Sequence, residues 1–548
     1  MLKSSELVSP VSFPATSRAG LPVLVKSEWA ITALLVLIAG LPTLALWNRA
    51  SYLTGDSYQY LRAATTFANG QGLRDMSGGP FTFLTPLYPV LIGIACRLAP
   101  GVSIETTARL ISLAGATTAV IAFYWLLRVR HSLWISFSAS LLFALLPLRV
   151  WSGLWALSEG LFLGLLMLGL AVLFRPAKNF WFRSALGGVL LGLAYLTRPE
   201  AMLCVAAIAA LFFFKAPQGK KRALVILFSF LTIAVPYHAR VYQATGHLSS
   251  GRLSLLFTQS ESFKRGLGPQ FVYSHEVSRS GTSVQEHTPD MSVRAVLTRY
   301  AFFARWEANR LVYDLGPYWI VVFLLVVGFV GLALLNGGPL KGFVFDDTWQ
   351  LVLLLMLFVL PLLHIEDRYL LQALPVFLLW LTLIVIGIYR FFTSRLSERS
   401  KLIAALIPLS FISLFVLSYG TRLFAQVPER DSSALARGTA HWLESQNLSA
   451  ASILSQTPDL AFFSSAQHLW MPGGEPDHVV MYAQQNGARY IYVSSQDAST
   501  PLNELLLGSE TQIPASLQLL HEETDGSARG RLFELKSANV VVSSHLHL

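Results

Sequence analysis

Long apolar runs separated by short polar segments fill the chain before residue 428. A helix needs about 20 apolar residues to cross the hydrocarbon core of a bilayer. The run 84–98 contains Pro86 and Pro89, so it predicts a helix lying on the membrane surface. The alternative is that this run is a twelfth transmembrane span. The other runs predict about eleven transmembrane helices, near 28–47, 104–127, 132–150, 153–174, 183–197, 199–215, 222–239, 317–336, 348–364, 368–392 and 402–424.

The pattern changes after residue 428. An amphipathic helix is predicted for "DSSALARGTAHWLESQN", strands for "ASILS", "RYIYVSS" and "GRLFELK", and a helix that stops at glycine for "PDHVVMYAQQNG". From Arg430 to the end there are six Lys/Arg and twelve Asp/Glu, a charge of −6, whereas the remainder carries +16. We expect a small soluble α/β domain here.

Composition supports a membrane protein. The 548 residues are 53% apolar and only 13% charged, and the mean hydropathy is +0.53. A soluble protein of this length could not bury so much apolar surface. The net charge of +10 does not indicate nucleic acid, because the basic residues gather in short loops between apolar runs. Cys96 and Cys204 are too few for a disulfide framework or a zinc site.

Charge in the loops predicts the topology. Every second loop is basic, for example at Arg128 and Arg130 and at Lys220 and Lys221, and such loops face the cytoplasm. We therefore expect a multi-pass protein of a bacterial inner (plasma) membrane. The predicted parts are a disordered cytoplasmic tail 1–27, a transmembrane domain 28–427 with outer loops 48–103 and 240–316, and an extracytoplasmic α/β domain 428–548.

The first outer loop opens with "SYLTGDSYQYLRAATTFANG", Ser51 to Gly70. Its apolar spacing predicts an amphipathic helix that ends at Gly70. Asp56 is predicted at the N-cap, with Gln59 completing a capping box. One interpretation is that Asp56 only caps the helix. The other is that Asp56 is a general base, and the two are compatible, because the positive helix end keeps the carboxylate ionised, as a general base requires.

Further ionisable groups are predicted on the same side of the membrane. They are Arg149 and Glu159, Arg198 and Glu200 in "LTRPEA", and His364, Glu366, Asp367 and Arg368 in "LHIEDRYLLQALP". Ionisable groups at a membrane boundary usually face a cavity. Any single arginine is equally explained by snorkelling to the interface. Several arginines among acids instead suit a phosphate, because guanidinium offers a fork of donors that stays charged.

These segments resemble a known family. "GDSYQYLRAATTFANGQG" followed by "PFTFLTPLYPVLIGI" is similar to the first outer loop of the GT-C membrane glycosyltransferases, in the branch of protein O-mannosyltransferases and aminoarabinose transferases. "SEGLFLGLLML", "GLAYLTRPEAML" and "RYLLQALPVFLLW" resemble its later spans. The resemblance implies a GT-C-like polytopic α-helical protein carrying a soluble domain on its outer face.

The resemblance also implies an activity. Such enzymes move a sugar from a polyprenyl phosphate to a protein, lipid or glycan acceptor outside the cytoplasm, with inversion at the anomeric carbon. The family's loop aspartate corresponds to Asp56, which would be the base. The remaining predicted substrate-binding residues are Arg198, Arg368, His364, Asp367, Glu200, Arg62 and Tyr60. No cofactor is expected beyond the lipid-linked donor.

One departure concerns metal binding. Many relatives carry two adjacent acids where this chain has Asp56 followed by Ser57. This departure argues against a metal site or a second catalytic acid next to Asp56, so no metal ligand is assigned. Glu105 and Asp75 stay open as possible metal ligands.

Two other classes compete with the enzyme. A transporter or flippase of a lipid-linked or small polar substrate often shows inverted repeats and helices broken at mid-membrane. This sequence has no clear repeat, and its ionisable groups lie at outer helix ends. A non-catalytic assembly or sensor protein would not need Asp56.

Overall fold

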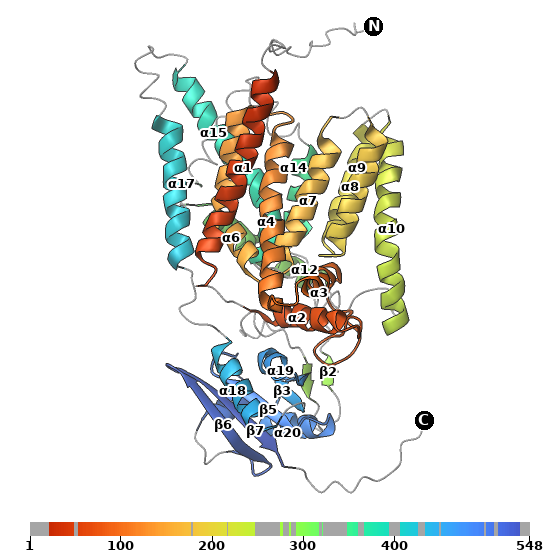
Figure 1. Cartoon of the computed structure of the whole chain (residues 1–548), viewed down its shortest axis with the longest axis vertical. Helices are drawn as coiled ribbons and strands as arrows, with labels where there is room; N and C mark the ends of the chain where they lie inside the picture. The colour runs from red at the N-terminus through yellow and green to blue at the C-terminus, as the bar shows by residue number, and fades with distance from the viewer. Residues whose placement is uncertain are drawn as a thin grey trace.

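The structure is a computed structural model of the chain (Figure 1). It describes residues 21–48, 53–176, 179–215, 218–246, 275–277, 284–286, 292–316, 321, 348–359, 367–393, 406–425, 433–448, 451–497, 500–508 and 513–536.

A bundle of upright helices forms one end of the molecule (Figure 1). Its helices are α1 (Leu21–Ala45), α4 (Ile104–Leu127), α5 (Leu133–Leu145), α6 (Pro147–Leu154), α7 (Glu159–Phe174), α8 (Phe180–Tyr195), α9 (Ala201–Lys215), α10 (Gly219–Thr245), α14 (Thr348–Val359), α15 (Leu374–Thr393) and α17 (Leu406–Ala425). The helix α12 (Val293–Leu315) and the 3₁₀ helix η3 (Asp367–Gln372) accompany the bundle, and the short strands β1 (His275–Val277) and β2 (Val284–Glu286) pair with each other.

The apolar helices identify a membrane protein. Three helices in the described part of the chain are long and apolar enough to cross a bilayer, or up to four if the bent pair α5 and α6 is one span. Six shorter apolar helices accompany them, including α3 (Leu87–Leu98). The count of eleven spans therefore stays a prediction, and most of the expected span 317–336 lies outside the described residues.

The predicted spans 132–150 and 153–174 need a correction. Helix α5 ends at Leu145, α6 runs from Pro147 to Leu154, and the two are bent by 57°. The break lies at Pro147, which has no N–H to donate and disfavours helical backbone at the residue before it. Consequently α7 begins at Glu159, six residues later than predicted.

Glycines let α4 and α7 pack backbone against backbone. A Cβ on Gly115 would lie 2.4 Å from Cα of Leu161, and one on Gly160 would lie 2.4 Å from the carbonyl oxygen of Ser112. Small residues are what close helix packing in membranes requires. This contact fixes the start of α7, where Glu159 lies.

Two helices of the segment 48–103, predicted above as the first outer loop, lie across the ends of the bundle, between it and the C-terminal sheet (Figure 1). They are α2 (Gly55–Ala68) and α3, and they pack together at Gly93. Arg97 donates to the carbonyls of Phe67 and Ala68 at 2.7 Å, so this loop arginine caps the end of α2. Arg97 thereby stabilises the fold of this segment.

The C-terminal part holds a five-stranded sheet in the order β4-β3-β5-β7-β6. Strands β3, β4 and β5 are parallel, whereas β7 runs antiparallel to β5 and β6. The strands are β3 (Ser452–Ser455), β4 (Gln467–Trp470), β5 (Tyr490–Ser494), β6 (Leu517–Asp525) and β7 (Ala528–Leu535), and the helices are α18 (Ala434–Ser445), α19 (Asp459–Phe463), α20 (Pro476–Gln485) and α21 (Pro501–Leu507).

The strands predicted from "ASILS", "RYIYVSS" and "GRLFELK" are β3, β5 and β7, and both predicted helices are present as α18 and α20. Every residue of β5 is buried, so it forms the centre of this unit. We refer to the described residues of 433–536 as the C-terminal unit.

Candidate active site

Helix α2 presents Asp56 in its first turn. The N-cap is Thr54, whose side chain accepts from the Ser57 amide, while the Ser57 hydroxyl accepts from the Thr54 amide at 3.1 Å. The predicted capping box of Asp56 and Gln59 is therefore wrong. Threonine and serine satisfy the free helix amides, which leaves the carboxylate of Asp56 available at the positive end of α2.

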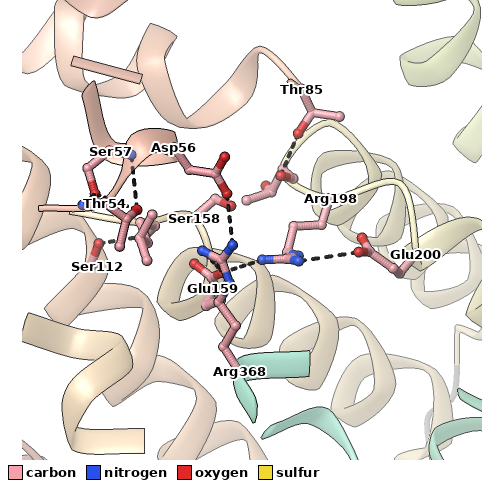
Figure 2. A network of polar contacts seen from close by, with 12 residues as sticks. Thr54, Asp56, Ser57, Thr85, Ser112, Ser158, Glu159, Arg198, Glu200 and Arg368 are labelled. Atoms are coloured by element: carbon pink, nitrogen blue, oxygen red, sulfur yellow. Dashed lines mark hydrogen bonds and ion pairs between the residues drawn. The ribbon is translucent and has the colours of Figure 1, made fainter. Parts of the chain in front are cut away.

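Asp56 faces an arginine from a distant part of the chain. Nη2 of Arg368 lies 2.9 Å from Oδ2 of Asp56, and Nη1 of the same guanidinium lies 3.2 Å from Oε1 of Glu159 (Figure 2). Arg368 belongs to η3 and Glu159 to the first turn of α7. A predicted phosphate ligand and the predicted base are thus direct neighbours.

Arg198 extends the network on the other side of Glu159. Its Nη1 donates to Oε1 of Glu159, and its Nη2 lies 3.3 Å from Oε1 of Glu200 (Figure 2). The guanidinium also lies over the ring of Tyr369, 4.6 Å from the ring centre. Its side chain is only 4% exposed, so its position is fixed. Glu159 therefore holds both guanidiniums in one place.

A pocket opens onto this network. It is small and partly open to solvent, and it is lined by Glu159, Phe162, Leu163, Arg198, Glu200, Arg368, Tyr369, Leu371 and Gln372. Both guanidiniums line it together with apolar side chains. Asp56 does not line the pocket itself, but it contacts Arg368, which does.

Comparison with known proteins identifies the fold. No protein-family model and no curated protein match the sequence. ArnT from Cupriavidus metallidurans, solved with undecaprenyl phosphate, is similar in structure with a TM-score of 0.56 at 11% identity, over 94% of this chain and 98% of that chain. The oligosaccharyltransferase of Archaeoglobus fulgidus has a TM-score of 0.55 at 13% identity, over 84% of this chain and 67% of that chain. The chain has the GT-C fold.

A third GT-C structure extends the comparison. The arabinofuranosyltransferase AftD from mycobacteria has a TM-score of 0.51 at 14% identity, over 94% of this chain and 40% of that chain. The GT-C fold expected from the quoted segments is thereby confirmed. At these identities the likeness concerns the fold, so the roles of individual residues rest on the geometry of this chain.

The other predicted site residues differ in how close they lie to this network. Tyr60 is buried, and its hydroxyl lies 3.0 Å from that of Ser158, directly before Glu159. Among the described residues, Arg62 forms no hydrogen bond or ion pair with the network, and its Nε has no hydrogen-bond partner there. Asp367 begins η3, and His364 lies outside the described residues.

Sequence reasoning missed the central role of Glu159. It flagged the residue only as flanking a turn together with Arg149. Arg149 is fully buried and donates to the carbonyl of Ala39 at 2.8 Å, away from the other charged residues. The signal for Glu159 was its place at the start of an otherwise apolar helix, where a carboxylate is costly without a partner.

The two acids left open as metal ligands already have partners. Oδ1 of Asp75 accepts from the Ser77 amide and hydroxyl and from the Gly79 amide. Both carboxylate oxygens of Glu105 lie 3.0 Å from Nη2 of Arg437. No group of three or more His, Cys, Asp or Glu in the described residues is placed to hold a metal ion.

Proposed function

We propose that this chain is an inverting glycosyltransferase that moves a sugar from a polyprenyl-phosphate carrier to an acceptor. The observation that carries the proposal is the contact between Asp56 and Arg368, with Arg198 held beside them by Glu159. A base and two phosphate-binding cations within one network are the groups that this transfer requires.

Proteins with this fold support the choice of donor. ArnT was solved with undecaprenyl phosphate. The archaeal oligosaccharyltransferase AglB, similar to this chain with a TM-score of 0.51, was solved with a dolichol phosphate and an inhibitory peptide. The guanidiniums of Arg198 and Arg368 match the phosphate of such lipids, because a guanidinium can donate two parallel hydrogen bonds to it.

The transfer uses these groups in one displacement. The acceptor hydroxyl or amine attacks the anomeric carbon from the face opposite the phosphate, and its proton passes to Asp56. The bond between the anomeric carbon and the phosphate oxygen breaks, and both electrons leave with the polyprenyl phosphate. Arg198 and Arg368 stabilise the charge that develops on this oxygen. The sugar configuration inverts because there is a single attack.

Donor binding also frees the base. Three carboxylates and two guanidiniums make up the network, so an incoming phosphate gains a cation only by displacing a carboxylate. Asp56 is the most exposed of the three, at 27% for its side chain against 4% for Glu159 and 14% for Glu200. It is therefore the carboxylate that gives up Arg368 and turns to the acceptor.

We place this chemistry on the extracytoplasmic face of a bacterial inner membrane. The basic loops predict the opposite side as cytoplasmic, and α2, η3 and the C-terminal unit then share the outer side.

The substitution Asp56→Asn tests the proposal. Envelope glycans and lipids are compared by mass spectrometry in cells without the gene and in cells complemented with the parental chain or with this variant. We expect the glycan or lipid product to be lost without the gene, restored by the parental chain and not restored by Asp56→Asn, although the variant inserts normally. Asp477→Asn, at an exposed position of α20, should restore it fully.

A transporter or flippase gives a different result. It would change the side on which a lipid-linked substrate accumulates without attaching a sugar. If Asp56→Asn cells contain the parental amount of product, Asp56 is not the base, and the transporter or flippase is favoured.

A further inference from the structure

The C-terminal unit rests on the first outer loop (Figure 1). The His468 amide of strand β4 donates to the carbonyl of Met76 at 3.0 Å, and the Met76 side chain is buried in the apolar core of the C-terminal unit. Gly78 lies in the left-handed region, with φ of 87°, and its Cβ position is 3.5 Å from Nε2 of Gln467. The turn built around Asp75 is thus shaped to fit the edge of the sheet.

The same contacts continue into α2. The Met76 amide donates to Oε1 of Gln59 at 3.3 Å. The rings of Phe462 and Phe463 in α19 pack on Tyr58, with ring centres 5.6 Å and 5.8 Å away. Tyr58 and Gln59 follow Asp56 by two and three residues, so the C-terminal unit holds the turn of α2 that carries the proposed base.

An ion pair ties the C-terminal unit to the bundle at the same place. Nη2 of Arg437 in α18 lies 3.0 Å from each carboxylate oxygen of Glu105 in the first turn of α4. The Arg437 guanidinium also lies over the ring of Phe463, 4.1 Å from its centre. Arg437 therefore joins α4 of the bundle to the aromatic pair that packs on α2.

Helix α2 depends on such contacts. It has 14 residues, and an isolated helix of that length is marginal in water, so tertiary packing must hold it. One side packs on α3 at Gly93, whose Cβ position is 2.9 Å from the carbonyl of Ala64. The other side is covered by Phe462 and Phe463.

We propose that the docked C-terminal unit positions Asp56 for catalysis and that Arg437 is a positioning residue. The inference rests on the proposed function for its catalytic consequence, whereas the docking itself is independent of it. Undocking would loosen α2 and move the carboxylate relative to Arg368, and misplacing a catalytic group by about 1 Å can cost about 100-fold in rate.

Hydrogen exchange of the full-length protein tests the docking without reference to activity. Arg437→Glu repels Glu105, and Glu105→Gln removes the charge from the membrane side. In both variants we expect the amides of Gly55–Ala68 to exchange about three- to ten-fold faster than in the parental chain. Arg437→Lys keeps the charge and should restore most of the protection. Unchanged exchange in both disruptive variants overturns the proposal.

The matched control breaks another ion pair of the same unit. Arg489 lies 3.2 Å from Glu534 on the partly exposed side of the sheet. Arg489→Glu should leave the exchange of α2 unchanged. If it accelerates α2 as much as Arg437→Glu does, the effect reflects general loosening, and the positioning role of Arg437 is refuted.

Kinetics then separates this inference from the proposed function. With a polyprenyl-phosphate sugar that the parental chain uses, Arg437→Glu should lower kcat about ten-fold and leave KM for the donor within about two-fold. Faster exchange in α2 with unchanged kcat rejects Arg437 as a positioning residue while Asp56 stays essential. Loss of protection in α2 combined with full activity of Asp56→Asn refutes the proposed function alone.

Discussion

Arg368 contacts Asp56 across 312 positions of sequence. Residue chemistry alone marked both as members of one site, since an acid and an arginine at a membrane boundary are costly unless they meet. It did not show that Thr54 and Ser57 cap α2, because serine, threonine and aspartate are almost equally good caps. It also did not show that Glu159 joins the two arginines, because that contact depends on how α7 and η3 pack.

At the residue scale, Arg368→Ala should weaken binding of the donor lipid. A charge-assisted hydrogen bond contributes about 1.5–3 kcal/mol, so we expect the Kd for undecaprenyl phosphate to rise about ten- to 100-fold. Binding is measured with the purified protein in detergent. The Kd of Arg368→Lys should lie between those of the parental chain and Arg368→Ala, because lysine keeps the charge but lacks the planar fork of donors.

Arg489→Ala is the control for that experiment, because Arg489 lies on the C-terminal sheet away from the pocket. Equal affinity of Arg368→Ala and the parental chain would exclude Arg368 from the phosphate site.

Helix positions were largely predictable at the element scale, because apolar runs must be buried or lie in lipid. The ends were less predictable. Pro147 lies within a continuous apolar stretch, so hydropathy hid the break that it causes between α5 and α6. The strands β3, β5 and β7 were predicted, but the order β4-β3-β5-β7-β6 was not, since pairing depends on crossover connections rather than on local pattern.

The contact of α4 with α7 makes a prediction at this scale. Gly160→Ala would place a methyl group 2.4 Å from the carbonyl oxygen of Ser112, and this backbone atom cannot yield without moving α4. We expect a loss of about 1–3 kcal/mol in stability, seen as a lower Tm in detergent. Glu159 is the adjacent residue, so donor binding should weaken as well.

The control is Gly40→Ala in α1, where nothing lies within 4 Å of the added Cβ. Alanine favours a helix over glycine, so this variant should be unchanged or slightly more stable. If both variants melt at the same temperature, close packing of α4 on α7 does not limit stability.

At the scale of the whole molecule, two acids meet at the start of α19, the helix that docks the C-terminal unit onto α2. The Thr457 hydroxyl lies 3.0 Å from Oδ1 of Asp459, the first residue of α19, and 3.2 Å from Oδ1 of Asp497, which follows β5. Burial raises the pKa of Asp459 to about 6. Burial and the neighbouring Asp459 raise the pKa of Asp497 to about 7.

These shifts predict that the docked unit is less stable in mild alkali. A carboxyl whose pKa is raised by folding binds more protons when folded, so the free energy of unfolding falls as pH rises through the folded pKa. Burial lowers the pKa of His468 to about 4, and this group acts in the opposite direction between about pH 4 and 6.5. The histidine offsets only part of the effect of the two carboxyls. The offset fades only by about pH 7.5, because half of the unfolded histidine still carries its proton at pH 6.5.

Between pH 6.5 and 8 we therefore expect the C-terminal unit to lose about 0.5 kcal/mol of stability, measured by hydrogen exchange of β5 amides at each pH after correction for the intrinsic exchange rate. Asp497→Asn should remove most of this loss, because it removes both the titrating group and the charge that acts on Asp459. His468→Gln should steepen the loss just above pH 6.5, because it removes the group that acts in the opposite direction. A parental slope that persists in Asp497→Asn would show that other groups govern the pH dependence of this unit.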